Sequence, residues 1–367
     1  MAKADGMRIL ARTHDEPPDF QMNPEWPALI DSEEQLDEVM TRPRPALVEF
    51  VKTLASPLLI LGAGGKMGPS LAVLARRAAD AAGHPLRIVA ASRFSEPKLR
   101  GWLEARGVET VACDLLERAA VARLPEAAAV LYLVGLKFGT QQNPALTWAV
   151  NTLVPSLVAE RYPQARIAAL STGNVYPLMP VAGGGATERD ALTPLGEYAN
   201  AAIARERIFQ YGSQKHGTSV ILLRLNYAVD LRYGVLVDIA QKVWQGEPVD
   251  AGMGYLNCIW QGDANDMILR SLPLARSPAA VLNLTGTEVL SVRKLAERFG
   301  ELMGRTAQIV GSEKDTALLS NSARLTGLLG EPPTSLDLVM RWTAHWIMRQ
   351  GRTLGKPTHF DVRDGKY

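Results

Sequence analysis

The stretch Leu58-Leu-Ile-Leu-Gly-Ala-Gly-Gly-Lys-Met-Gly68 indicates the fold of this chain more clearly than any other segment. Its four aliphatic residues predict a short buried strand, and a helix-forming stretch follows over 70–82. Between them Gly62, Gly65 and Gly68 recur at three-residue spacing. Such glycines permit a tight turn and a close backbone approach to a phosphate, and the N-terminus of the next helix offers free N–H groups to the anion. In this context the motif predicts a dinucleotide site, the alternative being a purely structural turn.

The same strand-then-helix rhythm continues along the chain. Helix-forming segments rich in Ala, Leu and Arg separate short aliphatic runs at 57–61, 87–91, 108–112, 129–134, 166–170 and 219–225. Continuous apolar runs indicate strands covered on both faces, so we expect an α/β fold with a doubly wound, Rossmann-like parallel sheet. Asn143 followed by Pro144 is typical of a helix start.

Beyond about residue 230 the rhythm loosens, which predicts a smaller lobe that completes a cleft. Helices are expected near 234–245, 263–275, 291–303 and 335–349. We therefore divide the chain into an N-terminal extension (1–55), a dinucleotide-binding domain (56–230) and a substrate-binding lobe with a tail (231–367). In the extension, Ser32 and Gln35 predict a capped helix through Met40. We expect the extension to pack on the domain surface, with a substrate lid as the alternative.

Composition excludes several classes of function. A net charge of +2 with 21% charged residues provides no field suited to nucleic acid. No apolar stretch approaches the ~20 residues of a membrane span, and the only cysteines, Cys113 and Cys258, show no pairing pattern. The five histidines are scattered without metal-ligand spacing. We expect a soluble cytoplasmic protein, a homodimer, that binds a small molecule and no metal, nucleic acid or membrane.

Several motifs, in order, resemble those of the extended short-chain dehydrogenase/reductase family, which comprises NAD(P)-dependent sugar epimerases, dehydratases and reductases. The resemblance covers about residues 57–305 and includes Leu170-Ser-Thr-Gly-Asn-Val-Tyr176, Leu223-Arg-Leu-Asn226 and Trp260-Gln-Gly-Asp263. It implies cofactor contacts from Gly62, Gly65, Lys66, Met67, Gly68, Asp114, Leu115, Val134, Gly135, Lys137, Asn151 and Tyr198.

The end of the second strand bears on the choice of cofactor. NAD is normally held there by a carboxylate that bonds the adenosine ribose. This chain instead has Ala90-Ala91-Ser92-Arg93, without an acid. Ser92 can hydrogen-bond and the Arg93 guanidinium can grip a 2′-phosphate, so we expect NADP, with NAD as the alternative.

In the family a Ser or Thr orients the substrate, a Tyr transfers a proton, and a Lys four residues later provides a positive charge. The resemblance assigns the first two roles to Thr172 and Tyr198, but the fourth residue after Tyr198 is Ala202. A free phenol titrates near pH 10, whereas a general acid or base works best near the operating pH, so a nearby cation is needed. We expect Lys137 to provide it, with Arg205 as the alternative. The substrate contacts implied are Ser171, Thr172, Asn174 and Asn226.

A literal Tyr-x-x-x-Lys does occur from Tyr211 to Lys215. It lies thirteen residues further along the same predicted helix, roughly 20 Å from Tyr198, and beside the helix end. We therefore expect it to have no catalytic role.

These observations predict an NAD(P)-dependent oxidoreductase or epimerase that acts on a hydroxyl or carbonyl group of a sugar-like or nucleotide-sugar substrate. The alternative is a non-catalytic NADP-binding sensor of the same fold. Retention of Thr172 and Tyr198 favours catalysis, and Ala202 favours the sensor.

Overall fold

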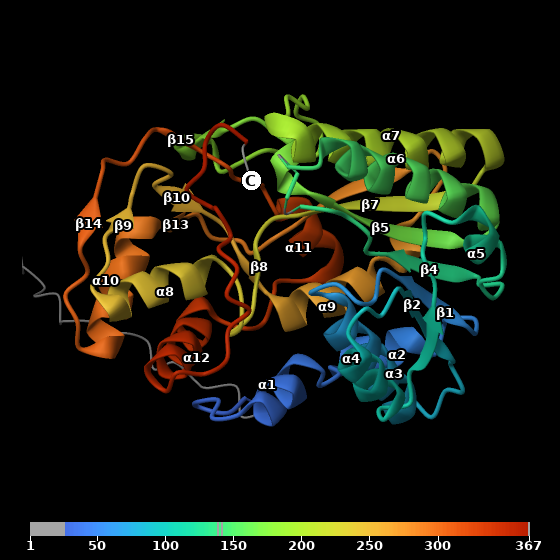
Figure 1. The fold of residues 1–367 in the computed structure, drawn as a ribbon, viewed down its shortest axis with the longest axis horizontal. Helices are drawn as coiled ribbons and strands as arrows, with labels where there is room; N and C mark the ends of the chain where they lie inside the picture. The colour runs from blue at the N-terminus through green and yellow to red at the C-terminus, as the bar shows by residue number, and fades with distance from the viewer. Residues whose placement is uncertain (1–25, 138, 141, 366–367) are drawn as a thin grey trace, which may run out of the picture.

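The structure, a computed structural model, describes residues 26–137, 139–140 and 142–365. The first part of the predicted extension, with Pro17, Pro18 and Pro24, lies outside the described residues. The sheet has seven parallel strands in the order β3-β2-β1-β4-β5-β7-β12 (Figure 1). Their bounds are Leu58–Leu61 (β1), Ile88–Ser92 (β2), Glu109–Ala112 (β3), Ala129–Tyr132 (β4), Arg166–Thr172 (β5), Ser219–Leu225 (β7) and Ala280–Leu284 (β12).

All six predicted strands are present, and the doubly wound parallel sheet is confirmed. The sequence did not predict β12, which extends the sheet beside β7. The strand order reverses direction between β1 and β4, and a ligand crevice forms at such a point outside the carboxyl ends of the strands. This edge carries the glycine turn and the segments that follow β2, β4 and β5.

Helices cover both faces of the sheet (Figure 1). In β1, Leu58 and Ile60 face one apolar core while Leu59 and Leu61 face the other, as the two-residue period of a strand requires. The first core takes in α2 (Pro45–Val51), α3 (Gly68–Ala81), α4 (Pro97–Glu104), α9 (Gln261–Arg270) and α11 (Ala323–Leu329), and the second takes in α5 (Arg118–Ala122), α6 (Pro144–Arg161) and α7 (Gly196–His216). The predicted start of α6 is present, with the Asn143 side chain accepting from the Leu146 N–H at 3.0 Å.

A third apolar core belongs to the smaller lobe. It is built mainly from α8 (Val235–Gln245), α10 (Val292–Met303) and α12 (Leu336–Met348). The helix predicted over 263–275 ends at Arg270 and is followed by a 3₁₀ turn at Leu272–Leu274. Short two-stranded pairs complete the fold: β6 (Met179–Pro180) with β15 (Thr316–Ala317), β8 (Ala228–Val229) with β11 (Ile259–Trp260), β9 (Val249–Asp250) with β14 (Ile309–Val310), and β10 (Tyr255–Leu256) with β13 (Leu290–Ser291).

The described part of the N-terminal segment joins the two cores. Helix α1 (Glu33–Met40) begins as predicted at Ser32, whose hydroxyl accepts from the Gln35 N–H at 3.2 Å. Leu36 and Met40 are buried in the core of the smaller lobe, whereas Leu47 and Val51 of α2 are buried beside α3 and α9. In this arrangement the buried side chains of residues 26–51 pack into the core beside α3 and into the core of the smaller lobe.

Candidate active site

The three glycines of the turn after β1 have different surroundings. Gly62 has a φ of +81°, and a Cβ there would lie 2.9 Å from Val134 Cγ2. A Cβ on Gly68 would collide with the backbone of Ala63, so this glycine lets α3 pack against the turn. Gly65 is exposed, and the nearest atom to a Cβ there would be Gly62 O at 3.4 Å. The backbone at Gly65 is therefore open to a ligand at the N-terminus of α3, as a diphosphate requires.

The ends of β2 and β3 lie next to this turn. Ser92 packs against it, since a Cβ on Gly64 would meet Ser92 Oγ at 2.5 Å. Arg93 is exposed at the strand end, while Leu115 is buried. The Asp114 carboxylate accepts from the Leu116 N–H at 3.0 Å and so shapes its own turn. These positions fit the adenosine end of a dinucleotide.

Ser171, a predicted substrate contact, is used in the interior instead. Its hydroxyl donates to Glu206 Oε1 at 2.5 Å. Glu206 is fully buried and paired with Arg224, at 2.7 Å from Nη2 to Oε2, and Arg224 also donates to the Tyr176 hydroxyl at 2.7 Å. Because a buried charge must be paired and hydrogen-bonded, this network engages the hydroxyl proton of Ser171.

Asn151, a predicted cofactor contact, is likewise an internal group. It is fully buried, donates to Thr147 O at 2.8 Å, and accepts from Arg205 Nη1 at 2.9 Å. The same Arg205 nitrogen donates to Val134 O at 2.9 Å. Arg205 thus braces the segment after β4, where Gly135 leaves room for its guanidinium.

Thr172 and Asn174 form one turn at the end of β5. The Thr172 hydroxyl donates to Asn174 Oδ1 at 3.0 Å and accepts from the Asn174 N–H at 3.2 Å. Asn226 lies behind this turn, because a Cβ on Gly173 would be 3.1 Å from its Cγ. It is buried and donates to Asn257 Oδ1 at 3.1 Å. Asn226 therefore supports the turn, and Asn174 is the more accessible of the two.

The position of the family lysine is filled by apolar side chains. Ala202 is fully buried in a cluster with Val175, Tyr176 and Ala186. A lysine here would bury an ammonium group among them. The Tyr-x-x-x-Lys motif from Tyr211 to Lys215 lies at the other end of α7 from Tyr198, and Tyr211 is 62% exposed.

A set of ionisable side chains is linked by electrostatic interactions: Lys66 with Lys137, Lys137 with Asp238, and Tyr233 with Asp238 and Tyr198. Lys66 Nζ donates to Ala228 O at 2.6 Å and lies 4.6 Å from the centre of the Tyr233 ring. Burial lowers the pKa of Lys66 to about 8, with Asp230 opposing and Lys137 adding to the effect. Burial likewise lowers the pKa of Lys137 to about 8, and the Asp238 carboxylate opposes it.

Tyr233 and Asp238 were not among the residues predicted from the sequence. Burial raises the pKa of the Tyr233 phenol, and the nearby Asp238 and Tyr198 raise it further. Burial also raises the pKa of Asp238, against two hydrogen bonds from Thr358. The one available signal was Asp238 itself, the only acidic residue in α8. The site thus contains two lysines, each of which donates to a backbone carbonyl, Lys66 to Ala228 O and Lys137 to Thr358 O.

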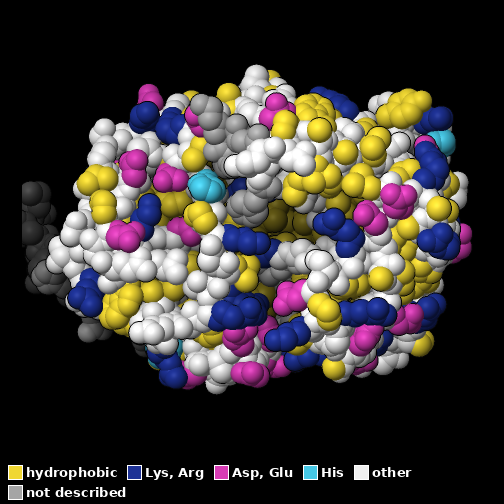
Figure 2. Space-filling view, viewed as in Figure 1, with side chains coloured by type: hydrophobic (Ala, Val, Ile, Leu, Met, Phe, Trp, Pro, Cys, Tyr) yellow, Lys and Arg dark blue, Asp and Glu magenta, His cyan; other side chains and the backbone are white. Residues whose placement is uncertain are grey.

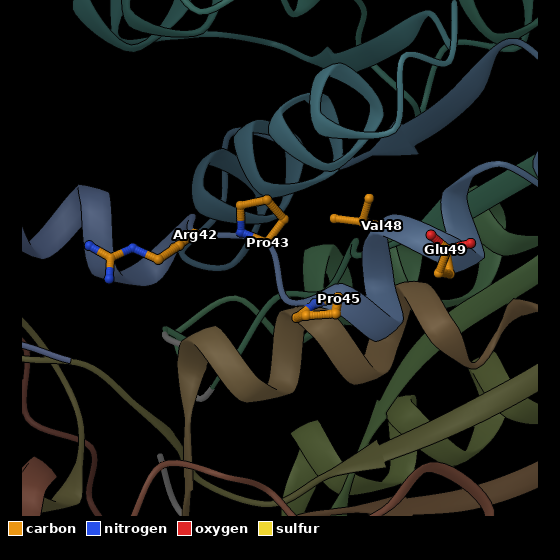
Figure 3. A pocket seen from close by; sticks show the side chains of 5 residues that line it. All are labelled: Arg42, Pro43, Pro45, Val48 and Glu49. Carbon is orange, nitrogen blue, oxygen red and sulfur yellow. The ribbon is translucent and has the colours of Figure 1, made fainter. Parts of the chain in front are cut away.

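The crevice opens on the face shown in Figure 2, where a hollow with apolar side chains on its floor lies between the two lobes. A separate surface pocket, lined by Arg42, Pro43, Pro45, Val48 and Glu49, lies where α1 leads into α2 (Figure 3). None of these five residues belongs to the glycine turn or to the ionisable cluster. Within the described residues no helix is long and apolar enough to cross a membrane, and no group of three or more His, Cys, Asp or Glu could hold a metal ion.

Comparison with known proteins agrees with this geometry. Residues 58–229 match the model of the family described as "NAD dependent epimerase/dehydratase family". A comparison with curated protein sequences finds no match.

Solved structures share the fold at low identity. The UDP-glucuronic acid 4-epimerase from Bacillus cereus, in complex with NAD, is 15% identical with a TM-score of 0.67, and the match covers 80% of this chain and 99% of that one. The UDP-glucose 4-epimerase from Thermus thermophilus, in complex with NAD, is 20% identical with a TM-score of 0.63, over 79% of this chain and 98% of that one. The UDP-Glc/GlcNAc 4-epimerase from Campylobacter jejuni is 17% identical with a TM-score of 0.66, over 80% of this chain and 100% of that one.

The match of residues 58–229 agrees with the resemblance noted in the sequence, and the solved structures confirm the predicted fold. Residues 58–229 are thus similar to the NAD dependent epimerase/dehydratase family, and the chain shares its fold with these nucleotide-sugar epimerase structures.

Proposed function

We propose that this protein is a nucleotide-sugar epimerase or oxidoreductase that uses a bound nicotinamide dinucleotide. The observation that carries the proposal is an open glycine turn at the sheet edge where a doubly wound fold binds its ligands, with Lys66 of this turn held against Ala228 O and the Tyr233 ring. Three structures that share the fold are UDP-sugar 4-epimerases, and two of these three are complexes with NAD.

The residues of the turn fit a dinucleotide. The exposed Gly65 backbone and the N-terminus of α3 would hold the diphosphate, and Lys66 would add a positive charge. Ser92 and Arg93 would lie at the adenosine ribose. No acid stands at the end of β2, so we infer that the 2′-phosphate of NADP is accepted there, bound by the exposed Arg93 guanidinium.

The remaining residues would act on the substrate. When bound, the nicotinamide supplies hydride transfer. Tyr198 would exchange a proton with the reacting hydroxyl or carbonyl, as a general acid or base. Thr172 and Asn174, joined in one turn, would orient the sugar. Lys137 would provide the positive charge that Ala202 cannot.

The test is direct. Purified protein is incubated with NAD or NADP and with UDP-glucose or UDP-glucuronic acid, and products are separated by chromatography. Mass spectrometry of denatured protein identifies any nucleotide that co-purifies. Formation of the 4-epimer, or stoichiometric reduction of the cofactor, is the expected result. A protein that binds NADP but leaves every sugar nucleotide unchanged would instead be the non-catalytic sensor.

A further inference from the structure

The C-terminal segment 351–365 runs through the crevice between the lobes. It leaves α12 and, in Figure 1, rises as the red chain between the two lobes to the C mark. Near its start Arg352 pairs with Glu33, at 2.5 Å between Nε and Oε1. Further on, Leu354 N–H donates to Arg232 O at 2.8 Å.

Thr358 is the point at which this segment reaches the candidate site. Its N–H and its hydroxyl both donate to one oxygen of Asp238, at 2.8 and 2.5 Å. Its carbonyl accepts from Lys137 Nζ at 3.2 Å. Thr358 is 2% exposed. A helix of the smaller lobe is thereby connected through the tail to the lysine that follows β4.

The end of the segment, at Arg363 and Gly365, is also held in place by contacts with other elements. The Arg363 guanidinium donates to Thr316 O at 2.8 Å and to Thr316 Oγ1 at 2.7 Å. Gly365 packs against Leu195 and Gly196, so closely that a Cβ on Gly365 would collide with the Leu195 carbonyl. Tyr198 follows two residues later on α7. The segment therefore spans from Lys137 to the helix turn that carries Tyr198.

Phe360, between these two anchors, is 3% exposed and belongs to the core of the smaller lobe. A segment that lies on a surface and leaves easily has few buried apolar contacts. This one has a buried aromatic residue, a buried threonine and a paired arginine. The geometry favours a permanent wall over a lid.

We propose that segment 351–365 is a fixed wall of the substrate site, and that Asp238, acting through Thr358, is a positioning residue for Lys137. The inference rests on the proposed function for the identity of the site, but its tests do not all depend on turnover. The same oxygen of Asp238 accepts both bonds from Thr358, so an asparagine oxygen can replace it, whereas alanine cannot.

The experiment compares Asp238→Ala, Asp238→Asn and, as a matched control, Lys356→Ala, which changes an exposed residue of the same segment. Hydrogen exchange of residues 351–365 is followed by mass spectrometry, and Lys137 is acetylated with dilute acetic anhydride. We expect Asp238→Ala to speed both exchange and Lys137 acetylation by at least about 10-fold. Asp238→Asn should keep most of the protection of segment 351–365 against exchange and of Lys137 against acetylation. Lys356→Ala should keep all of it.

With NAD and UDP-glucose, kcat/KM of Asp238→Ala should fall by about 100-fold, since small misplacements of reacting groups cost this much. Its affinity for NAD alone should change less than about 3-fold, because the glycine turn is untouched. Exchange in segment 351–365 of the unchanged protein should stay slow when both ligands are added.

Two outcomes would overturn the proposal. Faster exchange of the segment on addition of NAD and UDP-glucose would show that it leaves the site. Unchanged Lys137 acetylation in Asp238→Ala would show that Thr358 does not position the amine. A wild-type protein inactive on every sugar nucleotide would refute the proposed function instead, and the exchange and acetylation results would still decide the role of Asp238.

Discussion

Replacing Gly65 by aspartate should abolish binding of the dinucleotide while leaving the fold intact. A Cβ at this position would have Gly62 O at 3.4 Å as its nearest neighbour, which is ordinary van der Waals contact, and the residue is exposed. A side chain can therefore be added without strain in the protein. It would point into the space that the diphosphate needs.

The size of the effect follows from the charges. A carboxylate about 4 Å from one phosphate charge is repelled by about 4 kcal/mol at an effective dielectric constant near 20, which is about three orders of magnitude in Kd. Gly65→Asn has nearly the same shape without the charge, and Gly65→Ala tests the backbone alone. We expect Gly65→Ala to bind the dinucleotide most tightly, Gly65→Asn less tightly and Gly65→Asp most weakly.

Isothermal titration calorimetry with NADPH and NADH measures the three affinities, and thermal unfolding without ligand checks the fold. We expect the three unfolding temperatures to agree closely. The reasoning fails if Gly65→Asp binds NADPH within about 3-fold of Gly65→Asn, because repulsion at contact distance cannot be that small. The diphosphate would then lie elsewhere.

Four further changes test the site. Arg93→Ala should weaken NADP by roughly 1.5–3 kcal/mol, the scale of a hydrogen bond to a charged group, and equal losses for NAD in the same titration would exclude a 2′-phosphate contact. Tyr198→Phe should lower kcat by about 10²–10⁴-fold with unchanged cofactor affinity, and full turnover in a coupled assay would remove Tyr198 from the mechanism. Burial holds the pKa of Lys66 and of Lys137 at about 8, so both ammonium groups lose their protons as the pH rises through that value and the Kd for NADP should rise; a Lys66→Met protein should show a flatter titration curve, and a wild-type Kd that is constant from about pH 7 to about pH 9 would contradict this. Ala202→Lys, which restores the family pattern, should lower the midpoint of urea unfolding because it buries a charge in an apolar cluster, and an unchanged midpoint would mean that the cluster can open.

The local patterns of the chain were sufficient to predict six of the seven strands of the sheet. Six aliphatic runs form strands, and the glycine turn joins β1 to α3 as its spacing indicates. Each of these elements depends on interactions between residues a few positions apart, and such interactions produce a recognisable pattern in the sequence. Strand β12 was missed because its short run, Ala280–Leu284, lies among segments of mixed character.

The predictions for Ser171 and Asn151 came from a resemblance of motifs, which gave no sign of the internal hydrogen bonds that both residues make. Ser171 is bonded to Glu206, 35 positions away, and Asn151 to Arg205, 54 positions away. Motif spacing places a residue on an element, but it does not show which distant side chain will use its polar group. A buried hydroxyl or amide must find a partner, and the packing of α6 and α7 supplies it.

The glycine turn, the parallel sheet and the absence of an acid after β2 can all be predicted from neighbouring residues, because local backbone geometry and side-chain periodicity determine them. The surroundings of Lys137 depend instead on the whole chain. Its ammonium group donates to the carbonyl of Thr358, 221 positions away. The carboxylate that holds Thr358 belongs to Asp238, 120 positions from Thr358. Only the packing of two lobes, with the C-terminal segment between them, brings these atoms together, and no periodic pattern in the sequence records a contact at such separation.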